Sequence, residues 1–311
     1  MKKVNLFSKP SLNLLLIITL SCLIYSNSLE VPFVFDDKFA IVKNPIVKDL
    51  NYMFNPSEAK KYHGHFEYKS FKQRYVAYFT FALNYWLHGL DVTGYHLVNL
   101  KIHILNTLIL YWLVILTFKT PILASSSSKN SSNEIALFAS LLFSCHPIQT
   151  QAVTYIWQRV TLLSTTFFIL SLCLFITCRI NSKKSNKIVL ISLLLYFGSI
   201  LSAVLAMKTK EIAFTLPLVI FLYEIMFFEG KFLKRLFYNF PILLTMLIIP
   251  LSLIEIDKIG ADLIMNIRES TRVDTDILRW NYLLTQLVVI VTYLRLIFLP
   301  INQNLDYDFQ I

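Results

Sequence analysis

The chain has 311 residues with a mean hydropathy of +0.58, and 56% of them are hydrophobic but only 15% charged. A soluble domain usually carries about 25% charged residues. So much apolar surface cannot be buried in one water-soluble core, which excludes a soluble protein. The net charge of +10 is typical of membrane proteins, whose Lys and Arg orient the helices and meet anionic headgroups. Basic and aromatic residues do not alternate as in nucleic-acid readout, so no nucleic-acid partner is expected.

The predicted elements are the spans of an all-α polytopic membrane protein. A helix that crosses the hydrocarbon core needs about 20 apolar residues. Eight stretches meet this need: 11–28, 99–118, 134–153, 155–178, 188–206, 212–228, 241–256 and 282–300. The first follows lysines as a signal peptide does, but no small-residue cleavage site follows it, so we expect an uncleaved helix. The third and fourth are nearly continuous, which predicts a helical hairpin. The four cysteines lie in or beside apolar segments without CxxC spacing, and we expect small buried side chains rather than a metal site or disulfides.

The short loops predict the orientation. Lys and Arg gather in 179–187 and 229–240, on the same side as the N-terminal lysines and the Ser-rich linker 124–132. By the positive-inside rule this side is cytoplasmic. The opposite side receives a long first outer loop, about 29–98, and then the turns 146–159 and 208–211 and the segment 257–281. Within that long loop the aromatic stretch 74–90 predicts a helix in the membrane interface, with Gly89 as its stop signal.

Charge is costly in a membrane protein, so polar clusters mark candidate functional sites. Asp36 and Asp37 follow an apolar patch shortly after the first span. Like charges in a partly desolvated place raise at least one pKa, and such a carboxylate can take a proton from an attacking hydroxyl. The alternative, favoured on spacing alone, is that one of them caps a short helix starting near Phe39.

The stretch from His146-Pro147 to Arg159 is the second polar cluster. Gln151, Thr154 and Gln158 follow the proline at helical spacing, which predicts one polar face. An arginine at the outer end of a span can clamp a phosphate with its two-pronged guanidinium. It can equally extend its charge toward lipid headgroups, and the sequence leaves these two readings even.

Two further places hold polar groups. The charged turn at Lys208, Lys210 and Glu211 runs against the positive-inside bias, which favours an anionic partner, although a local ion pair explains it as well. Arg74 precedes a stripe on one face of the second span, made of His96, Asn99 and His103. We expect that stripe to be a packing network and not a metal site, because no third histidine or carboxylate accompanies the two histidines.

In this order the clusters resemble the multi-span glycosyltransferases of the type-C fold, which use polyprenyl-phosphate sugars. The chain is most similar to the branch with C-terminal tetratricopeptide repeats, the protein O-mannosyltransferase type, and to its bacterial relatives. The stretches that carry the resemblance are 25–37, 41–45, 78–89, 95–103, 146–159, 210–217 and 293–300, of which the His-Pro-to-Arg stretch is the most specific.

The resemblance implies a mechanism. A lipid-phosphate sugar enters from the membrane, a Ser or Thr hydroxyl of a protein, or a glycan, accepts the mannose-like sugar with inversion, and an acidic residue of the first outer loop is the base. That base would be Asp36 or Asp37, with Asp37 preferred. The donor phosphate would be neutralised by Arg74, Arg159, Lys208 and Lys210. The pocket would be lined by His96, His146, Gln149, Gln158 and Glu211. No metal and no cofactor is expected, because cations can stabilise the phosphate leaving group.

The chain departs from this family in two respects. Arg74 is followed by Tyr75 where the family often has proline, and the family has further spans and repeats beyond the position of Ile311. We therefore expect one glycosyltransferase-like module over 1–311 that is C-terminally incomplete. The Lys, Asn and Ile bias favours a bacterial inner membrane over the endoplasmic reticulum. The alternatives are a transporter or lipid flippase, which would place its charges at the bilayer midplane, and a non-catalytic scaffold.

Overall fold

The computed structural model describes residues 9–62, 66–181, 188–253, 279–305 and 307. These described residues form helices and turns without any strand, which confirms the all-α prediction. Within the described part of the chain, five helices are long and apolar enough to cross a membrane: Pro10–Ser28, Val92–Thr117, Ile156–Asn181, Leu190–Met207 and Phe232–Ser252. The chain is an integral, polytopic membrane protein.

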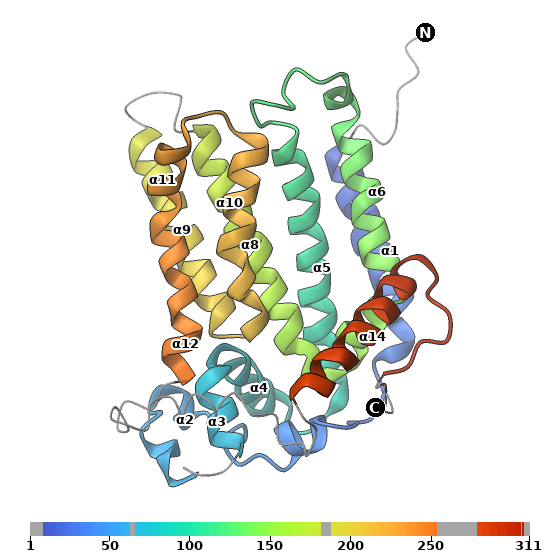
Figure 1. The fold of residues 1–311 in the computed structure, drawn as a ribbon. Coiled ribbons are helices and arrows are strands. Elements are labelled where there is room, and N and C mark those ends of the chain that lie inside the picture. The colour runs from blue at the N-terminus through green and yellow to red at the C-terminus, as the bar shows by residue number, and fades with distance from the viewer. Residues whose placement is uncertain (1–8, 63–65, 182–187, 254–278, 306, 308–311) are drawn as a thin grey trace.

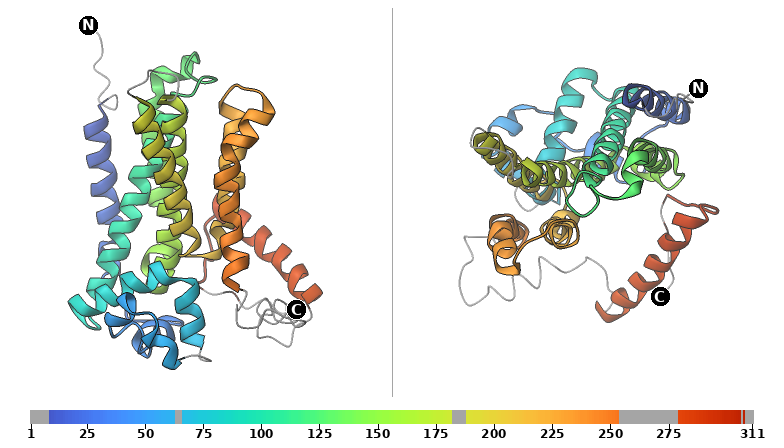
Figure 2. Two further views of the ribbon diagram at one scale, coloured as in Figure 1. Left: turned by 90° about the vertical axis from the view of Figure 1, so that its left-hand side faces the viewer. Right: turned by 90° about the horizontal axis from the view of Figure 1, so that it is seen from above.

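The long helices form a bundle (Figure 1). Helix α5 (Val92–Thr117) lies between α6 (Ser132–Cys145) and α8 (Arg159–Asn181), and α1 (Pro10–Tyr25) packs on α5 and α6. Helix α9 (Ile188–Met207) pairs along α8. Beyond them lies a second group made of α10 (Leu216–Phe227), α11 (Phe232–Leu244) and α12 (Ile248–Leu253) (Figure 2). The predicted spans 134–153 and 155–178 therefore do not pack as a simple hairpin, because α5 lies between α6 and α8 and contacts both.

Several predicted spans differ from the observed helices: the span 99–118 begins earlier, at Val92, and the span 282–300 holds only a shorter apolar helix, Leu283–Phe298. The span 134–153 is broken, because Pro147 cannot continue α6, and a separate short helix α7 (Gln149–Thr154) follows. The span 212–228 shortens to α10, which follows the 3₁₀ turn η7 (Glu211–Thr215). The span 241–256 begins earlier, at Phe232, so most of the predicted loop 229–240 is helix. Its last residues and most of 257–281 lie outside the described residues. Eight full spans are therefore more than this part of the chain shows.

The long first loop folds into a layer across one end of the bundle, with short helices α2 (Asn51–Phe54), α3 (Phe66–Gln73) and α4 (Tyr75–His88). The predicted helix at 74–90 is confirmed. It stops at Gly89, whose φ of +59° lies in the left-handed region that favours glycine. Aromatic and aliphatic side chains of this layer form a buried cluster with Tyr155, Ile156, Trp157, Val160 and Leu163 at the start of α8. We call this the loop end of the bundle.

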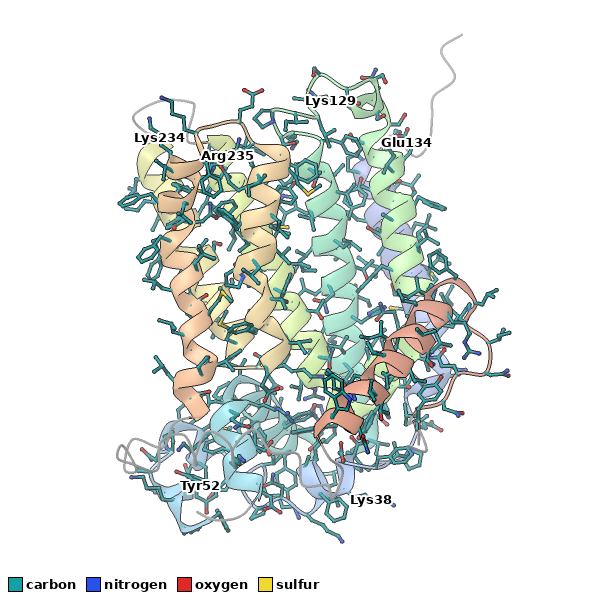
Figure 3. The ribbon with its side chains drawn as sticks, in the orientation of Figure 1. Lys38, Tyr52, Lys129, Glu134, Lys234 and Arg235 are labelled. Atoms are coloured by element: carbon teal, nitrogen blue, oxygen red, sulfur yellow. The ribbon has the colours of Figure 1, made fainter. Side chains whose placement is uncertain are left out.

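Figure 3 places Lys129, Lys234 and Arg235 at the opposite end, which we call the basic end, and Lys38 and Tyr52 at the loop end. This division matches the two sides that the sequence predicts; that the basic end is cytoplasmic stays a prediction. Helix α14 (Arg279–Phe298) runs obliquely beside the loop end rather than along the bundle axis (Figures 1 and 2). The cysteines are all free, as expected, but Cys22 is exposed and Cys145 only partly buried.

Candidate active site at the loop end

Asp37 fastens the first loop to the start of α8. Its side chain is buried, with 1% exposed. Its Oδ1 accepts a hydrogen bond from the backbone N–H of Trp157 at 2.7 Å, and its Oδ2 accepts one from Val34 at 3.0 Å. Burial raises the pKa of Asp37 to about 6, although these two N–H groups favour the charged form. The carboxylate makes no capping bond to the following turn (Lys38–Val42), so the capping interpretation is not what the structure shows.

Asp36 lies in a different environment from its neighbour. It is exposed, and its backbone N–H donates to the hydroxyl of Tyr155 at 3.0 Å. Phe35, directly before it, has a φ of +43°, a left-handed conformation that costs a bulky residue on the order of 1–3 kcal/mol. Its ring packs edge-on against Tyr155, 6.2 Å between centroids. Asp36 is therefore the carboxylate of the pair that a substrate can reach, on a loop held in one conformation.

Arg74 and Lys210 come together from distant parts of the chain. Arg74 is one quarter exposed, forms a two-pronged ion pair with Glu211 (3.3 and 3.4 Å), and lies 6.0 Å from the centre of the Trp157 ring. The Lys210 ammonium donates to Thr161 Oγ1 at 2.7 Å. Burial, together with the nearby Arg74 charge, lowers the pKa of Lys210. Two cations around one carboxylate leave positive charge available for an anionic ligand.

Gln158 joins this cluster, because its Oε1 accepts a hydrogen bond from the Thr161 hydroxyl. Lys208 lies at the same turn and is partly exposed, and its carbonyl accepts from Val76 N–H at 3.4 Å. Predicted residues from three regions of the chain thus meet around Trp157, whose N–H holds Asp37 and whose ring faces Arg74. We call the residues Asp36, Asp37, Arg74, Lys210 and Glu211 the acid–cation cluster.

Arg159 lies beneath this cluster without any exposed surface. Its guanidinium donates to Asn99 Oδ1 and Asn84 Oδ1, both at 2.8 Å, to the carbonyl of Tyr95 at 3.0 Å and to that of Thr80 at 3.3 Å. These partners leave it no open face toward a ligand. Phosphate binding by Arg159 stays an untested prediction, and the geometry favours a different role.

The polar stripe of α5 bonds to backbone carbonyls of other segments. His96 Nε2 bonds to Val31 (2.8 Å) and His103 Nε2 to Ser144 (3.2 Å), while the Asn99 amide donates to Val153 and Ile156, both at 3.3 Å. Among the residues that the structure describes, no group of three or more His, Cys, Asp and Glu could hold a metal ion. This arrangement is that of a packing network.

The remaining predicted pocket residues lie elsewhere. His146 Nε2 bonds to the carbonyl of Ile297 at 3.0 Å, so this ring contacts the end of α14. Gln151 also turns that way, donating to the carbonyl of Leu305 at 2.9 Å, and Gln149 begins α7 partly exposed. The predicted single face for Gln151, Thr154 and Gln158 does not form, because the helix breaks at Tyr155.

The sequence reasoning missed Tyr155, Trp157 and Thr161 as parts of the site. Their signal was present, since two aromatic residues follow a polar stretch directly before a buried arginine. Helical periodicity cannot show a helix break that lacks a proline or glycine at the break itself. Tyr155 and Trp157 lie at that break, and Thr161 lies in the first turn of α8 directly after it.

The fold and the acid–cation cluster define a polytopic membrane protein with a candidate active site at one membrane surface. Comparison with known proteins refines this class. The chain is 36% identical over 191 residues to a protein O-mannosyl-transferase of Caenorhabditis elegans, covering 58% of this chain and 25% of that protein. It is 33% identical over 234 residues to the protein O-mannosyl-transferase Tmtc3 of Drosophila melanogaster, covering 70% and 25%. The human protein O-mannosyl-transferase TMTC3 is 31% identical over 230 residues, covering 71% and 22%.

These matches confirm the resemblance that the motifs indicated: the chain is a relative of the protein O-mannosyl-transferases of the TMTC type. In each of these three pairs the matched region is about a quarter of the relative's length or less. No family model matches the chain, and no solved structure matches it.

Proposed function

We propose that this chain is a membrane glycosyltransferase that moves a mannose-like sugar from a polyprenyl or dolichyl phosphate to a Ser or Thr hydroxyl of a protein, or to a glycan. The observation that carries the proposal is the acid–cation cluster. An exposed carboxylate, Asp36, is held by Tyr155, and two cations, Arg74 and Lys210, are held by Glu211 and Thr161, all at one end of a membrane bundle. The similar proteins are named protein O-mannosyl-transferases, which supports mannosyl transfer and a protein acceptor.

The proposed reaction is a displacement at the anomeric carbon. The acceptor hydroxyl gives its proton to the Asp36 carboxylate as its oxygen forms a bond to that carbon. The bond between the anomeric carbon and the phosphate oxygen breaks, the electron pair leaves with the lipid phosphate, and the configuration inverts. Arg74 and Lys210 stabilise the charge of the departing phosphate, so the proposed reaction needs no metal ion.

The assignment of the base changes with the geometry. A pKa of about 6 would suit Asp37 as a base, but its two oxygens accept backbone N–H groups and its side chain is buried. A base must reach the proton that it abstracts, and reach is decided before pKa. We therefore assign proton transfer to Asp36 and the anchoring of the loop to Asp37.

Glu211 is proposed to hold the cations ready before the donor binds. Its carboxylate pairs with Arg74 through long bonds of 3.3 and 3.4 Å, and a phosphate would compete for the same guanidinium. We further propose that the loop end lies outside and the N-terminus in the cytoplasm. The bacterial inner membrane rests on composition alone and stays a prediction.

The test is a transfer assay with the chain in proteoliposomes. We expect mannose to move from a polyprenyl-phosphate donor to a peptide rich in Ser and Thr, with no transfer from a nucleotide sugar. The same vesicles, loaded with labelled donor in one leaflet, measure flipping. If the donor crosses the bilayer and no sugar is transferred, the chain is a flippase and not the proposed enzyme. If the chain shows neither transfer nor flipping, the non-catalytic scaffold is the remaining alternative.

A further inference from the structure

Arg159 is a buried cation that forms no direct ion pair with a described carboxylate, although the charge of Asp37 acts on it. The ion pairs among the described residues are Arg74–Glu211 and Arg179–Glu224, and Arg159 takes part in neither. Its hydrogen-bond partners are neutral amide and carbonyl oxygens, and its guanidinium carbon lies 4.5 Å from the centre of the Phe81 ring. A desolvated charge of this kind is costly, and an apolar side chain would pack the same place at lower cost. What Arg159 supplies is the fixed geometry of its planar fork.

Asn99 connects this fork to the helix break. Its Oδ1 accepts from Arg159 Nε at 2.8 Å, which turns its Nδ2 toward the carbonyls of Val153 and Ile156. Those carbonyls lie on either side of the break, because α7 ends at Thr154 and the next turn begins at Ile156. Asn99 thus bonds to backbone carbonyls on both sides of the interruption, of which that of Ile156 also accepts the backbone N–H of Arg159.

The break presents two groups to the first loop. The Tyr155 hydroxyl accepts the N–H of Asp36 at 3.0 Å, and the Trp157 N–H donates to Asp37 at 2.7 Å. The other arm of the Arg159 fork holds α4 through Asn84 and the Thr80 carbonyl, and that helix starts directly after Arg74. The buried Arg159 side chain therefore contacts α4, the helix that follows Arg74. Through Asn99 it also contacts the segment 153–157, which bonds to Asp36 and Asp37.

We propose that Arg159 and Asn99 are positioning residues, which set the distance between the Asp36 carboxylate and the Arg74–Lys210 cations. This inference rests on the proposed function for its catalytic consequence. It differs from the sequence-based prediction for Arg159, in which the guanidinium touches the donor phosphate. A misplacement of about 1 Å between reacting groups can lower a rate on the order of 100-fold without weakening substrate binding.

The experiment compares Asn99→Ala with a matched control, Asn106→Ala. Both asparagines are fully buried on α5, and both donate their amide to a backbone carbonyl, but Asn106 bonds to Leu162 within α8 at 2.9 Å, away from the break. The first measurement is hydrogen exchange of peptides that cover 34–37 and 153–158. We expect roughly tenfold faster exchange in Asn99→Ala and wild-type exchange in Asn106→Ala. Unchanged exchange in Asn99→Ala would overturn the proposal.

The second measurement is the initial rate of transfer against donor concentration. We expect Arg159→Gln and Arg159→Lys to lower kcat about 30- to 100-fold with donor KM within about threefold, since lysine keeps the charge but loses the fork. A raised donor KM with unchanged kcat would make Arg159 a phosphate ligand instead. Full activity of Arg159→Lys would also overturn the proposal, because charge alone would then suffice.

The two measurements distinguish failure of the proposed function from failure of the positioning role. If the wild-type chain transfers no sugar from any lipid phosphate, the proposed function fails, while hydrogen exchange still decides whether Asn99 holds the loop. If Asn106→Ala loses as much kcat as Asn99→Ala at equal thermal stability, the effect is general loosening of the bundle and the positioning role is wrong.

Discussion

Two arginines of α8, Arg159 fully buried and Arg179 partly buried, lie at opposite ends of the bundle, and their hydrogen-bonding groups are satisfied in different ways. At the basic end, Arg179 forms a two-pronged ion pair with Glu224 (2.8 and 2.5 Å) and lies 5.0 Å from the ring centres of both Phe228 and Tyr238. Glu224 is itself completely buried. At the loop end, Arg159 bonds to neutral oxygens. Arg179 is therefore neutralised by a direct ion pair, whereas Arg159 forms none with a described carboxylate and has only the more distant charge of Asp37 acting on it.

This difference between the two arginines distinguishes a structural ion pair at the basic end from the candidate site at the loop end. Arg179 and Glu224 tie α8 to α10, and their charges cancel where they meet. The loop end keeps Asp36 exposed, Asp37 bonded only to backbone N–H groups, and two cations facing one carboxylate. Charges left unbalanced near a membrane surface are costly for folding, and they are what an anionic donor and a nucleophilic acceptor need.

The largest expected effect separates the two adjacent carboxylates. We expect Asp36→Asn to lower kcat on the order of 1,000-fold, because the amide cannot accept the hydroxyl proton. Since Asp36 is exposed and offers only its backbone N–H to Tyr155, the thermal midpoint should stay close to that of the wild type. Transfer assays and thermal unfolding in detergent measure both quantities. Asp36→Glu is the matched variant, and it should retain more activity than the amide. Full transfer by Asp36→Asn would return the base to Asp37.

The next effect concerns stability and belongs to the basic end. Arg179→Met leaves Glu224 buried without its cation, which should cost about 3–5 kcal/mol of unfolding free energy. Adding Glu224→Leu should recover most of that loss, because the uncompensated carboxylate is then gone. Denaturant unfolding of the single and double variants gives the comparison. A double variant as unstable as Arg179→Met would mean that the rings of Phe228 and Tyr238 need the guanidinium itself.

A smaller effect is expected from the exposed cation of the cluster. Arg74→Ala should raise donor KM about tenfold and lower kcat less, since in the proposed reaction the guanidinium binds the phosphate in both the ground and the transition state. Lys72→Ala is the control, because Lys72 lies over the Tyr68 ring and outside the cluster. An equal rise in KM for both variants would reduce the role of Arg74 to general attraction of the anionic lipid.

Much of the fold follows from composition and periodicity alone. Apolar runs predicted α1, α8 and α9 within a few residues, and the aromatic stretch before Gly89 predicted α4. The end of α5 was predicted as well, but this helix begins at Val92 rather than at residue 99. The sequence also predicted a turn between 153 and 155, where the helix does break, but it did not predict that a separate short helix α7 follows Pro147 or that α10 is shorter than a span. The break at Tyr155 and the short α10 depend on tertiary contacts, such as the Asn99 amide on the carbonyls of Val153 and Ile156.

The residue types of the candidate site follow from the sequence, but their environments do not. Asp36, Asp37, Arg74, Lys210 and Glu211 do gather at the loop end, as expected from charge placed where charge is costly. Sequence spacing could not tell which of two adjacent carboxylates is buried, because a single residue with positive φ, Phe35, decides how the pair is turned. It also could not tell that Arg159 is enclosed, since burial depends on α4 and α5 folding over it.

The smallest expected effect is the pH dependence of the Asp37 anchor. Its folded-state pKa of about 6 lies above the ordinary value, so the folded protein binds this proton more tightly than the unfolded chain does. The contribution of Asp37 to stability is therefore greatest at low pH and falls as pH rises toward about 6. We expect the midpoint of wild type minus that of Asp37→Asn to fall about 2–4 °C between pH 4 and pH 7. A difference that rises with pH would mean that the N–H groups of Val34 and Trp157 stabilise the charged carboxylate more than burial destabilises it. The charge of Asp37 would then be as fully compensated as that of Glu224 at the basic end.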